Sequence, residues 1–310
     1  METSKLSIAY AIASYGDPEP TTRLVNALQS DDEGAQVLLH RDSRSVNIGS
    51  DQLVAPGRIT TLKSRELFWG SFELIELFLE FLASAINTDS IEYVILLSGQ
   101  DYPSRNVHGL LDDLREADAW IDAKSLNGVD EAWMTRYHYR WIQVAKPTVL
   151  NRLIWQISRV LVPHLGRERI VARTKTRGGY CYGLRRGLPV NPPIVGGSTW
   201  MTLSRKAAIA ILDSESRQDP IWRYFRSSLV PDEVSFQTIL HSASEITIAP
   251  TNRRYIRWPG PKVLDLNDLE AIVDSGADFI RKIELPSSGP LLDELDSLAG
   301  RRRPVDRARI

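Results

Sequence analysis

The stretch YVILLSG at residues 93–99 decides the fold. Its first five residues are apolar without interruption, and Ser98 and Gly99 end the run. A strand with one face in water alternates apolar and polar residues, whereas an uninterrupted apolar strand is covered on both faces, as in a parallel sheet. We therefore expect residues 93–99 to form an inner strand between two layers of helices.

Segments of the same kind surround this stretch, and helical patterns separate them. Strands are predicted at LSIAYAIAS (6–14), QVLLHRD (36–42), RITTLK (58–63) and DAWIDA (118–123). Helices are predicted at TTRLVNALQS (21–30), at HGLLDDLREA (108–117) and over 64–86, where apolar residues recur three or four positions apart. The alternation up to residue 123 predicts the α/β class, as a doubly wound layer structure.

The bulk composition excludes several classes of function. The 310 residues are 43% hydrophobic and 25% charged with a formal net charge of −1, so a broad nucleic-acid-binding surface is not expected. The single cysteine, Cys181, excludes an intramolecular disulfide and a cysteine-based zinc site. No apolar run is long enough to span a bilayer, and the first apolar segment is expected to be a buried strand rather than a signal peptide. A cytoplasmic protein is predicted, with peripheral attachment at the inner face of the membrane left open.

The polar residues that follow the predicted strands are candidates for ligand binding, because ligands of such sheets lie at the carboxyl ends of the strands. HRD (40–42) and SGQDYP (98–103) occupy two such ends. His40 faces the same side of its strand as Asp42, and it is either a site residue or a core residue. For Asp101, contact with a ligand and the shaping of a turn are both open.

The stretch PDEVSFQTIL (231–240) begins a predicted helix with two adjacent carboxylates. Either both acids cap the helix, or Asp232 caps it or holds Glu233 in place while Glu233 acts as a general base. Adjacent residues of a helix diverge by about 100°, so the pair does not suit a retaining hydrolase, whose two carboxyl groups face one site.

Seven motifs occur in a fixed order along the chain. They are HRDSRS (40–45), FWGSFELIE (68–76), LLSGQDYP (96–103), GSTWMTLSR (197–205), PDEVSFQTIL (231–240), RRYIRW (253–258) and FIRKIE (279–284). In this order they resemble the core-2/I-branching family of glycosyltransferases (family 14), which includes peptide O-xylosyltransferases. The likeness is to compact bacterial members and extends from about residue 7 to residue 284.

The resemblance implies a GT-A-type α/β fold, with a Rossmann-like mixed sheet flanked by helices. It implies one GT-A-like catalytic domain over residues 1–285, with a nucleotide-sugar half (1–123) and an acceptor and diphosphate half (124–285). Residues 286–310 are expected to be a basic, flexible tail. The implied reaction is an inverting transfer of a sugar, GlcNAc or xylose first, from a UDP donor to an acceptor hydroxyl, with a β-linked product in bacterial glycan biosynthesis. The acceptor is open among a glycan, a lipid-linked sugar and a protein. No metal or other cofactor is expected, since basic side chains replace the Asp-x-Asp motif that this family typically lacks.

The family's catalytic and diphosphate-binding residues carry over onto the matching motifs. Glu233 falls on the proposed general base, and Lys282 falls on the lysine that binds the donor diphosphate. Arg254 is the first candidate for the accompanying arginine, before Arg257 and Arg281.

The remaining candidates concern the two sugars and the nucleotide. Asp42, with His40 beside it, is expected to contact the uridine or its ribose, and Gln100 and Asp101 the donor sugar. Gly70 either allows close approach of the nucleotide or serves helix packing. Trp200 either stacks on an acceptor sugar or is a buried strand residue.

Two alternatives stay open at this point. The first is a non-enzymatic protein that binds a glycan or a nucleotide with the same fold and without turnover. Such a protein would not need a general base at Glu233. The segment TKTRGGYCYGLRRGLP (174–189) is predicted to be a basic loop, either for handling phosphate or as a solvated connection, and it lies in the region that matches the family least (124–190).

Overall fold

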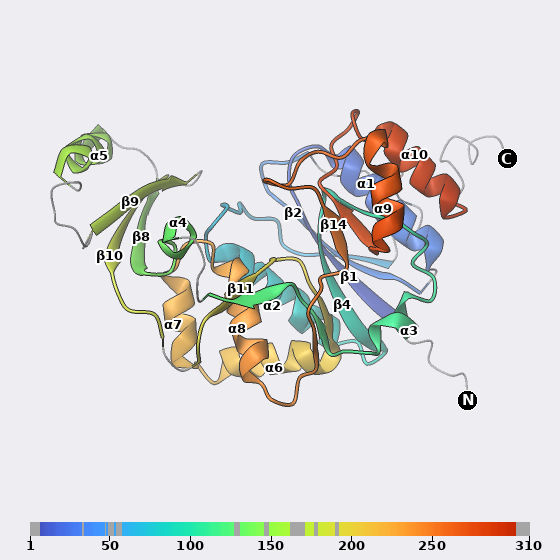
Figure 1. Ribbon diagram of the computed structural model, residues 1–310, viewed down its shortest axis with the longest axis horizontal. Helices are drawn as coiled ribbons and strands as arrows, with labels where there is room; N and C mark the ends of the chain where they lie inside the picture. Colours follow the sequence, from blue (N-terminus) through green and yellow to red (C-terminus); the bar gives the residue numbers. More distant parts are fainter. Residues whose placement is uncertain are drawn as a thin grey trace.

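A computed structural model gives the arrangement of the chain. It describes residues 7–32, 34–46, 48, 53, 58–126, 131–145, 149–161, 171–176, 179–189 and 192–301. The main element is a seven-stranded sheet in the order β13-β6-β12-β4-β1-β2-β3 (Figure 1). Its strands are β1 (Ser7–Ser14), β2 (Gln36–Arg41), β3 (Ile59–Thr61), β4 (Ile91–Ser98), β6 (Ala119–Trp120), β12 (Thr202–Ser204) and β13 (Ile248–Ala249).

The predicted inner strand is confirmed as β4. It pairs in parallel with β1 on one side and antiparallel with β12 on the other, and β12 is also antiparallel to β6. Alternate residues of β1 belong to opposite apolar clusters, with Ala9 and Ala11 on one face and Tyr10 and Ile12 on the other. The sheet is therefore mixed rather than all parallel, and it is covered on both faces, as the apolar run of β4 predicted.

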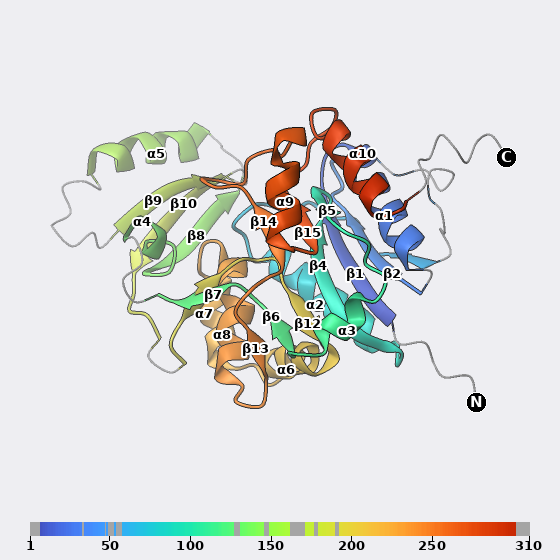
Figure 2. The same cartoon turned by 45° about the vertical axis from the view of Figure 1, so that its right-hand side comes forward.

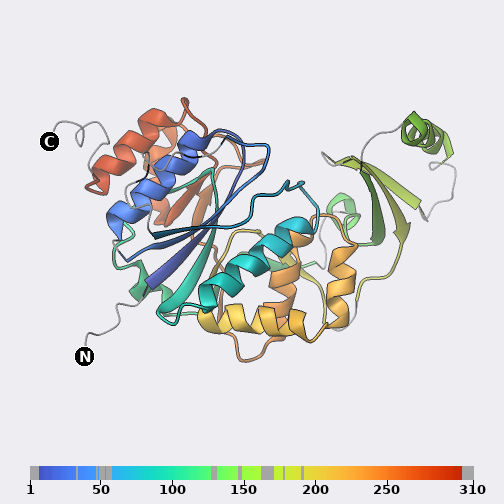
Figure 3. The same ribbon diagram turned by 180° about the vertical axis from the view of Figure 1, so that it is seen from behind.

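Helices form a layer on each face of this sheet (Figure 3). One face carries α2 (Glu73–Ile86), α6 (Arg205–Ser216), α7 (Pro220–Arg226) and α8 (Ser235–Ser242). The other carries α1 (Pro18–Asp31), α3 (Leu110–Leu114), α9 (Leu269–Ser275) and α10 (Gly289–Leu298). The described residues contain no helix long and apolar enough to cross a membrane.

The predicted helix over 64–86 starts later than expected, at Glu73. The chain passes through Gly70 with φ +81°, a left-handed conformation that an α-helix does not contain. The motif FWG (68–70) therefore lies in a turn before α2, and the exposed Trp69 is not part of the helix.

A second sheet lies at the carboxyl end of β4 (Figure 2). It consists of β14 (Arg254–Ile256), β15 (Phe279–Arg281) and β5 (Asp101–Pro103), which follows β4 after a two-residue turn. The two motifs predicted to bind diphosphate therefore meet SGQDYP at one place.

A small antiparallel sheet of β8 (Tyr139–Ala145), β10 (Gly179–Arg185) and β9 (Val171–Thr176) projects from the main sheet together with α5 (Val149–Leu161) (Figure 1). The loop predicted over 174–189 is wrong, because its residues supply the end of β9 and all of β10. Strand pairing explains the pattern: Cys181 is fully buried against Tyr139 and Trp141, and a Cβ at Gly183 would approach the Trp141 ring to 3.0 Å.

The flexible tail predicted for 286–310 is wrong over its described part. Residues 289–298 form α10, with Leu291, Leu292 and Leu295 fully buried, and the side chain of Arg301 is buried in ion pairs with Asp31 (2.6 Å) and Asp296 (3.2 Å). The apolar positions of α10 recur one and three to four residues apart, which is a helical pattern. Residues 302–310, most of the charge run, lie outside the described residues.

Candidate active site

The two adjacent acids lie on a single 3₁₀ turn, η4 (Pro231–Glu233), directly before α8. Asp232 points inward: it is buried, its Oδ2 accepts a hydrogen bond from Thr199 Oγ1 at 2.6 Å, and burial raises its pKa. Glu233 stays partly exposed. In the described chain neither η4 nor α8 has a side-chain cap, so the expectation that these acids cap the helix is wrong.

The carboxylate of Glu233 is held through one of its two oxygens. Oε2 accepts hydrogen bonds from Trp133 Nε1 at 3.1 Å and from Arg136 Nη1 at 2.5 Å. Within the described part of the chain, Oε1 has no hydrogen-bond donor. Burial, and then the charge of Asp232, raise the pKa of Glu233 to about 7, although Arg136 acts in the opposite direction. A carboxylate with one free oxygen and a pKa near neutrality suits proton transfer.

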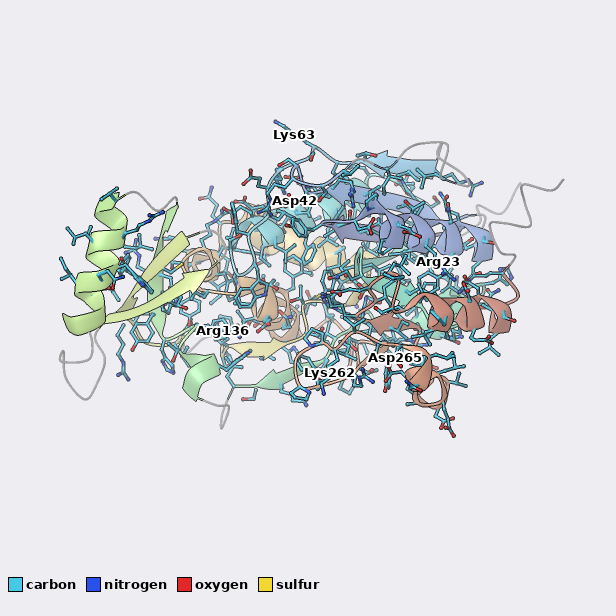
Figure 4. All side chains as sticks on the ribbon, turned by 90° about the horizontal axis from the view of Figure 1, so that it is seen from above. Arg23, Asp42, Lys63, Arg136, Lys262 and Asp265 are labelled. Atoms are coloured by element: carbon cyan, nitrogen blue, oxygen red, sulfur yellow. The ribbon has the colours of Figure 1, made fainter. Side chains whose placement is uncertain are left out.

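Arg136 links this carboxylate to an exposed aromatic side chain. Its guanidinium carbon lies 5.8 Å from the Trp69 ring centre and 5.9 Å from the Trp133 ring centre, and Trp69 is 58% exposed. Arg136 itself lies between the small sheet and the main sheet (Figure 4). An exposed indole that contacts the partner of a carboxylate offers a flat apolar face to a ligand.

Gly70 contacts the turn that carries the acids. Its carbonyl accepts a hydrogen bond from the Val230 backbone N–H at 2.9 Å, and a Cβ at Gly70 would meet Val230 Cγ2 at 3.3 Å. Val230 itself has a left-handed φ of +52°. Gly70 therefore holds the Trp69 turn against η4, and close packing rather than a long helix accounts for this glycine.

The four candidate cations of the C-terminal motifs each have a different partner. Arg254 is held by the backbone carbonyls of Leu96 and Asn252, both at 2.7 Å, and burial lowers its pKa to about 10, so it is protonated at neutral pH. Lys282 pairs with Glu284, two residues along. Arg257 pairs with Asp268 at 2.6 Å and bonds the Val263 carbonyl, contacts that tie it to the helix turn 266–268.

The fourth cation, Arg281 of β15, lies beside the carboxyl end of β4. Its Nη1 donates to Ser98 Oγ and to Asp101 Oδ1, the latter at 3.2 Å, and its guanidinium carbon lies 4.7 Å from the Trp200 ring centre. Asp101 is fully buried, and its other oxygen accepts from the Ser98 backbone N–H. These contacts fit a residue that shapes the turn after β4 rather than one that contacts a donor sugar.

Gln100 and Trp200 lie beside these groups. The Gln100 carbonyl accepts from the Ile283 N–H at 3.0 Å, and its amide is 3.5 Å from Glu284 Oε1, the partner of Lys282. Trp200 is partly buried and packs edge-on against Phe78, with ring centres 6.0 Å apart. Thr199 bonds Asp232 on η4, and the next residue, Trp200, contacts Arg281. These two neighbouring residues therefore connect η4 to the candidate cations.

His40 lies in β2 and Asp42 directly follows that strand, and both contact the segment that leads to α2. Both Asp42 oxygens are occupied, by Arg44 and by the Leu67 backbone N–H, and although burial would raise its pKa, these bonds lower it to about 2. His40 is fully buried, accepts from the Arg65 N–H at 3.3 Å, and has a pKa lowered by burial. The structure places His40 in the core, and Asp42 organises the segment that leads to Trp69.

Trp133 and Arg136 were missed as site residues by sequence reasoning. They are 97 or more positions from Glu233, in the region that matches the family motifs least. Trp133 lies on the four-residue helix α4 (Glu131–Met134) and Arg136 in the turn after it, so no helical periodicity in the sequence places the two side chains together. In the described ranges there is no group of three or more His, Cys, Asp or Glu placed to hold a metal ion.

Comparison with known proteins identifies the family. A family model described as "Core-2/I-Branching enzyme" matches residues 8–283. Two curated relatives from Arabidopsis thaliana are each 25% identical: beta-glucuronosyltransferase GlcAT14A over 80% of this chain and 57% of its own length, and GlcAT14B over 66% and 43%. The chain thus spans about half the length of these relatives.

Among solved structures, the galactosyltransferase LgtC in complex with donor and acceptor sugar analogues covers 98% of this chain and 100% of its own, with a TM-score of 0.38 and 10% identity. That likeness is remote, and the assignment rests on the family model, which spans nearly the whole chain. The chain belongs to the Core-2/I-Branching enzyme family, and its class is that of the glycosyltransferases.

Proposed function

We propose that the protein is an inverting, UDP-sugar-dependent glycosyltransferase in which Glu233 is the general base. The observation that carries this proposal is the state of Glu233: a partly exposed carboxylate with a pKa of about 7, oriented through Oε2 with Oε1 left for a ligand. A base with a pKa near the working pH is efficient, because it is deprotonated before the reaction and still accepts a proton readily.

The reaction is a single displacement at the anomeric carbon of the donor. The acceptor oxygen forms a bond to that carbon as the bond to the diphosphate oxygen breaks, and the acceptor hydroxyl proton passes to Glu233 Oε1. UDP leaves with the electron pair of the broken bond. Attack from the face opposite UDP inverts the anomeric centre and gives a β-linked product from an α-linked donor.

The leaving diphosphate gains negative charge in the transition state, and fixed cations there lower the barrier. Lys282 and Arg254 remain the proposed diphosphate ligands, with Arg281 next to them at the end of β4. Arg257 is the weakest of the candidates, since Asp268 already pairs with it. We propose that these cations act in place of a divalent metal, so that no cofactor is required.

The donor sugar and acceptor are proposed by class. The motif resemblance favours GlcNAc or xylose, and the names of the curated relatives add glucuronic acid. The acceptor is the hydroxyl of a glycan, a lipid-linked sugar or a protein, and a role in bacterial glycan biosynthesis is the setting we favour. Trp69 is better placed than Trp200 to meet an acceptor sugar, because it is exposed and its ring contacts Arg136, the partner of Glu233.

A donor panel tests the proposal. The purified chain is incubated with UDP-GlcNAc, UDP-xylose, UDP-glucuronic acid, UDP-glucose and UDP-galactose, with and without EDTA, and UDP release is measured. Release from one donor that is insensitive to EDTA and lost in Glu233→Gln is expected. Release abolished by EDTA would contradict the role given to the cations, and absence of both UDP release and calorimetric UDP binding would overturn the nucleotide-sugar assignment.

A further inference from the structure

The helix α5 exposes an apolar face that the rest of the described chain does not cover. Val149, Leu153, Ile154 and Ile157 are between 44% and 84% exposed. With about 100° per residue, these positions fall within an arc of about 140° on the helix. Four large aliphatic side chains gathered on one side of a helix form a patch, unlike single exposed apolar residues, which are ordinary.

The other side of α5 faces the small sheet. The ring of Trp155 meets that of Tyr182 on β10 at 6.0 Å between centres, and on the same helical scale Trp155 lies opposite the middle of the apolar arc. On β10, Tyr182 and Leu184 share one face, and Cys181 shares the opposite face with the residues packed towards the main body. The apolar arc therefore points outward, away from both the sheet and the core.

Two further apolar side chains are exposed on this part of the molecule. Leu184 is 52% exposed, and Ile142, which pairs with Tyr182 across the strands, is 55% exposed. The helix and sheet form the end of the molecule farthest from α1 and α10 (Figure 1). A flat surface could therefore reach this end without meeting the main sheet.

The charge of this segment differs from that of the whole chain. Residues 146–177 contain eight Lys or Arg and one Glu, a net +7, in a chain whose formal net charge is −1. An outward apolar helix face within a strongly basic segment has the two attractions that hold an interfacial helix on an anionic bilayer: burial of apolar side chains among the acyl chains, and attraction of cations to lipid phosphates. Uncharged and cationic surfaces offer only the first.

We propose that α5 is an interfacial helix that docks the protein on an anionic phospholipid surface through Val149, Leu153, Ile154 and Ile157. The docked protein would have α5 on the membrane surface, with the small sheet behind α5 and the main sheet beyond it. This proposal is independent of the sugar that the protein transfers, since none of these side chains contacts Glu233, Arg254 or Lys282 in the described structure.

Vesicle co-sedimentation of the full chain tests the proposal. Vesicles of phosphatidylcholine alone are compared with vesicles that also contain phosphatidylglycerol, at low and high salt. We expect binding to the phosphatidylglycerol vesicles that weakens with salt, and loss by about tenfold or more in Leu153→Glu/Ile157→Glu, because burying a single Leu is worth at least that factor. The matched control is Leu266→Glu/Val273→Glu, which alters two similarly exposed apolar residues near α9 and should bind as the wild type does.

The variant must also keep its fold, which far-UV circular dichroism and the melting temperature report. Equal binding by both vesicle types, equal binding by the α5 variant, or no binding at all would overturn the proposal. A wild-type dimer in size-exclusion chromatography that the α5 variant converts to a monomer, without vesicle binding in either, would assign the apolar face to a second copy of the chain instead.

Discussion

Arg136 and Glu233 form an ion pair at 2.5 Å between Nη1 and Oε2, and the Trp133 indole donates to the same oxygen. The pair is only partly buried, so it orients the carboxylate more than it stabilises the fold. Because both donors converge on Oε2, the second oxygen keeps its proton-accepting capacity. Arg136 is therefore proposed as a positioning residue that also limits how far the pKa of Glu233 rises.

The pH dependence of turnover should reveal this role. In the wild type, activity should increase with pH as Glu233 loses its proton, with a midpoint near its pKa of about 7. Arg136→Gln removes a charge that lowers this pKa, so the midpoint should move to higher pH. The kcat–pH profile measures the shift, and Arg217→Gln, at an exposed ion pair elsewhere, is the control. An unchanged or acid-shifted midpoint in Arg136→Gln would contradict the assignment.

Glu233 should also lower stability at neutral pH. Its pKa is raised from 4.5 to about 7 in the folded protein, so the folded state binds this proton more tightly than the unfolded chain does. Stability from this group is lost as pH rises from about 4.5 through 7. Relative to the wild type, Glu233→Gln should gain on the order of 1–3 kcal/mol between pH 5 and pH 8. Urea unfolding at both pH values measures the gain, and a pH-independent difference would refute it.

Lys282 and Arg257 should behave differently when replaced. Lys282→Ala is expected to lower kcat by about a hundredfold or more with little change in unfolding free energy, because a cation on the leaving diphosphate acts mainly in the transition state. Arg257→Ala should leave the buried Asp268 without its partner, so its effect should be mainly on stability. Turnover and urea unfolding of both variants separate these outcomes. Full activity of Lys282→Ala would remove Lys282 from the site.

Arg301 should be essential to the fold although it lies near the end of the described chain. Arg301→Ala leaves the buried carboxylate of Asp31 without its ion pair, whereas Asp296 keeps Arg23 at 2.7 Å, and we expect a loss of about 3–5 kcal/mol. Thermal or urea unfolding measures this loss. Adding Asp31→Asn should restore part of the lost stability by removing the uncompensated charge, and a loss below about 1 kcal/mol would show that the pair is not closely coupled to the core.

The main sheet could be predicted because each of its longer strands has a local sequence signal. The apolar runs of β4 and β1 indicate that both faces of the sheet are covered. The start of α2 was predicted too early, because the spacing of apolar residues does not reveal the left-handed φ of Gly70. The tail was mistaken for a flexible segment because its charge run is more conspicuous than the three leucines of α10.

Sequence reasoning predicted those parts of the candidate site that lie within a single motif. Glu233 stands out from the adjacent acids, but sequence could not tell which of them is buried, because Thr199 lies 33 positions away. Trp133 and Arg136 were missed for the same reason at a longer range. Their contacts with Glu233 depend on how the segment before the small sheet packs against η4, which no local sequence pattern encodes.

The short pairing of β7 (Ala123–Ser125) with β11 (Val195–Gly197) has an evolutionary consequence. The chain leaves the main body after β7 and returns beside it at β11, so everything between them is a loop closed at its base. Such an excursion can be lengthened, shortened or exchanged without altering the register of the main sheet. Because this excursion carries α5, Trp133 and Arg136, a relative with a different excursion would differ both in the proposed docking helix and in the contacts that orient Glu233, while the main sheet stayed the same.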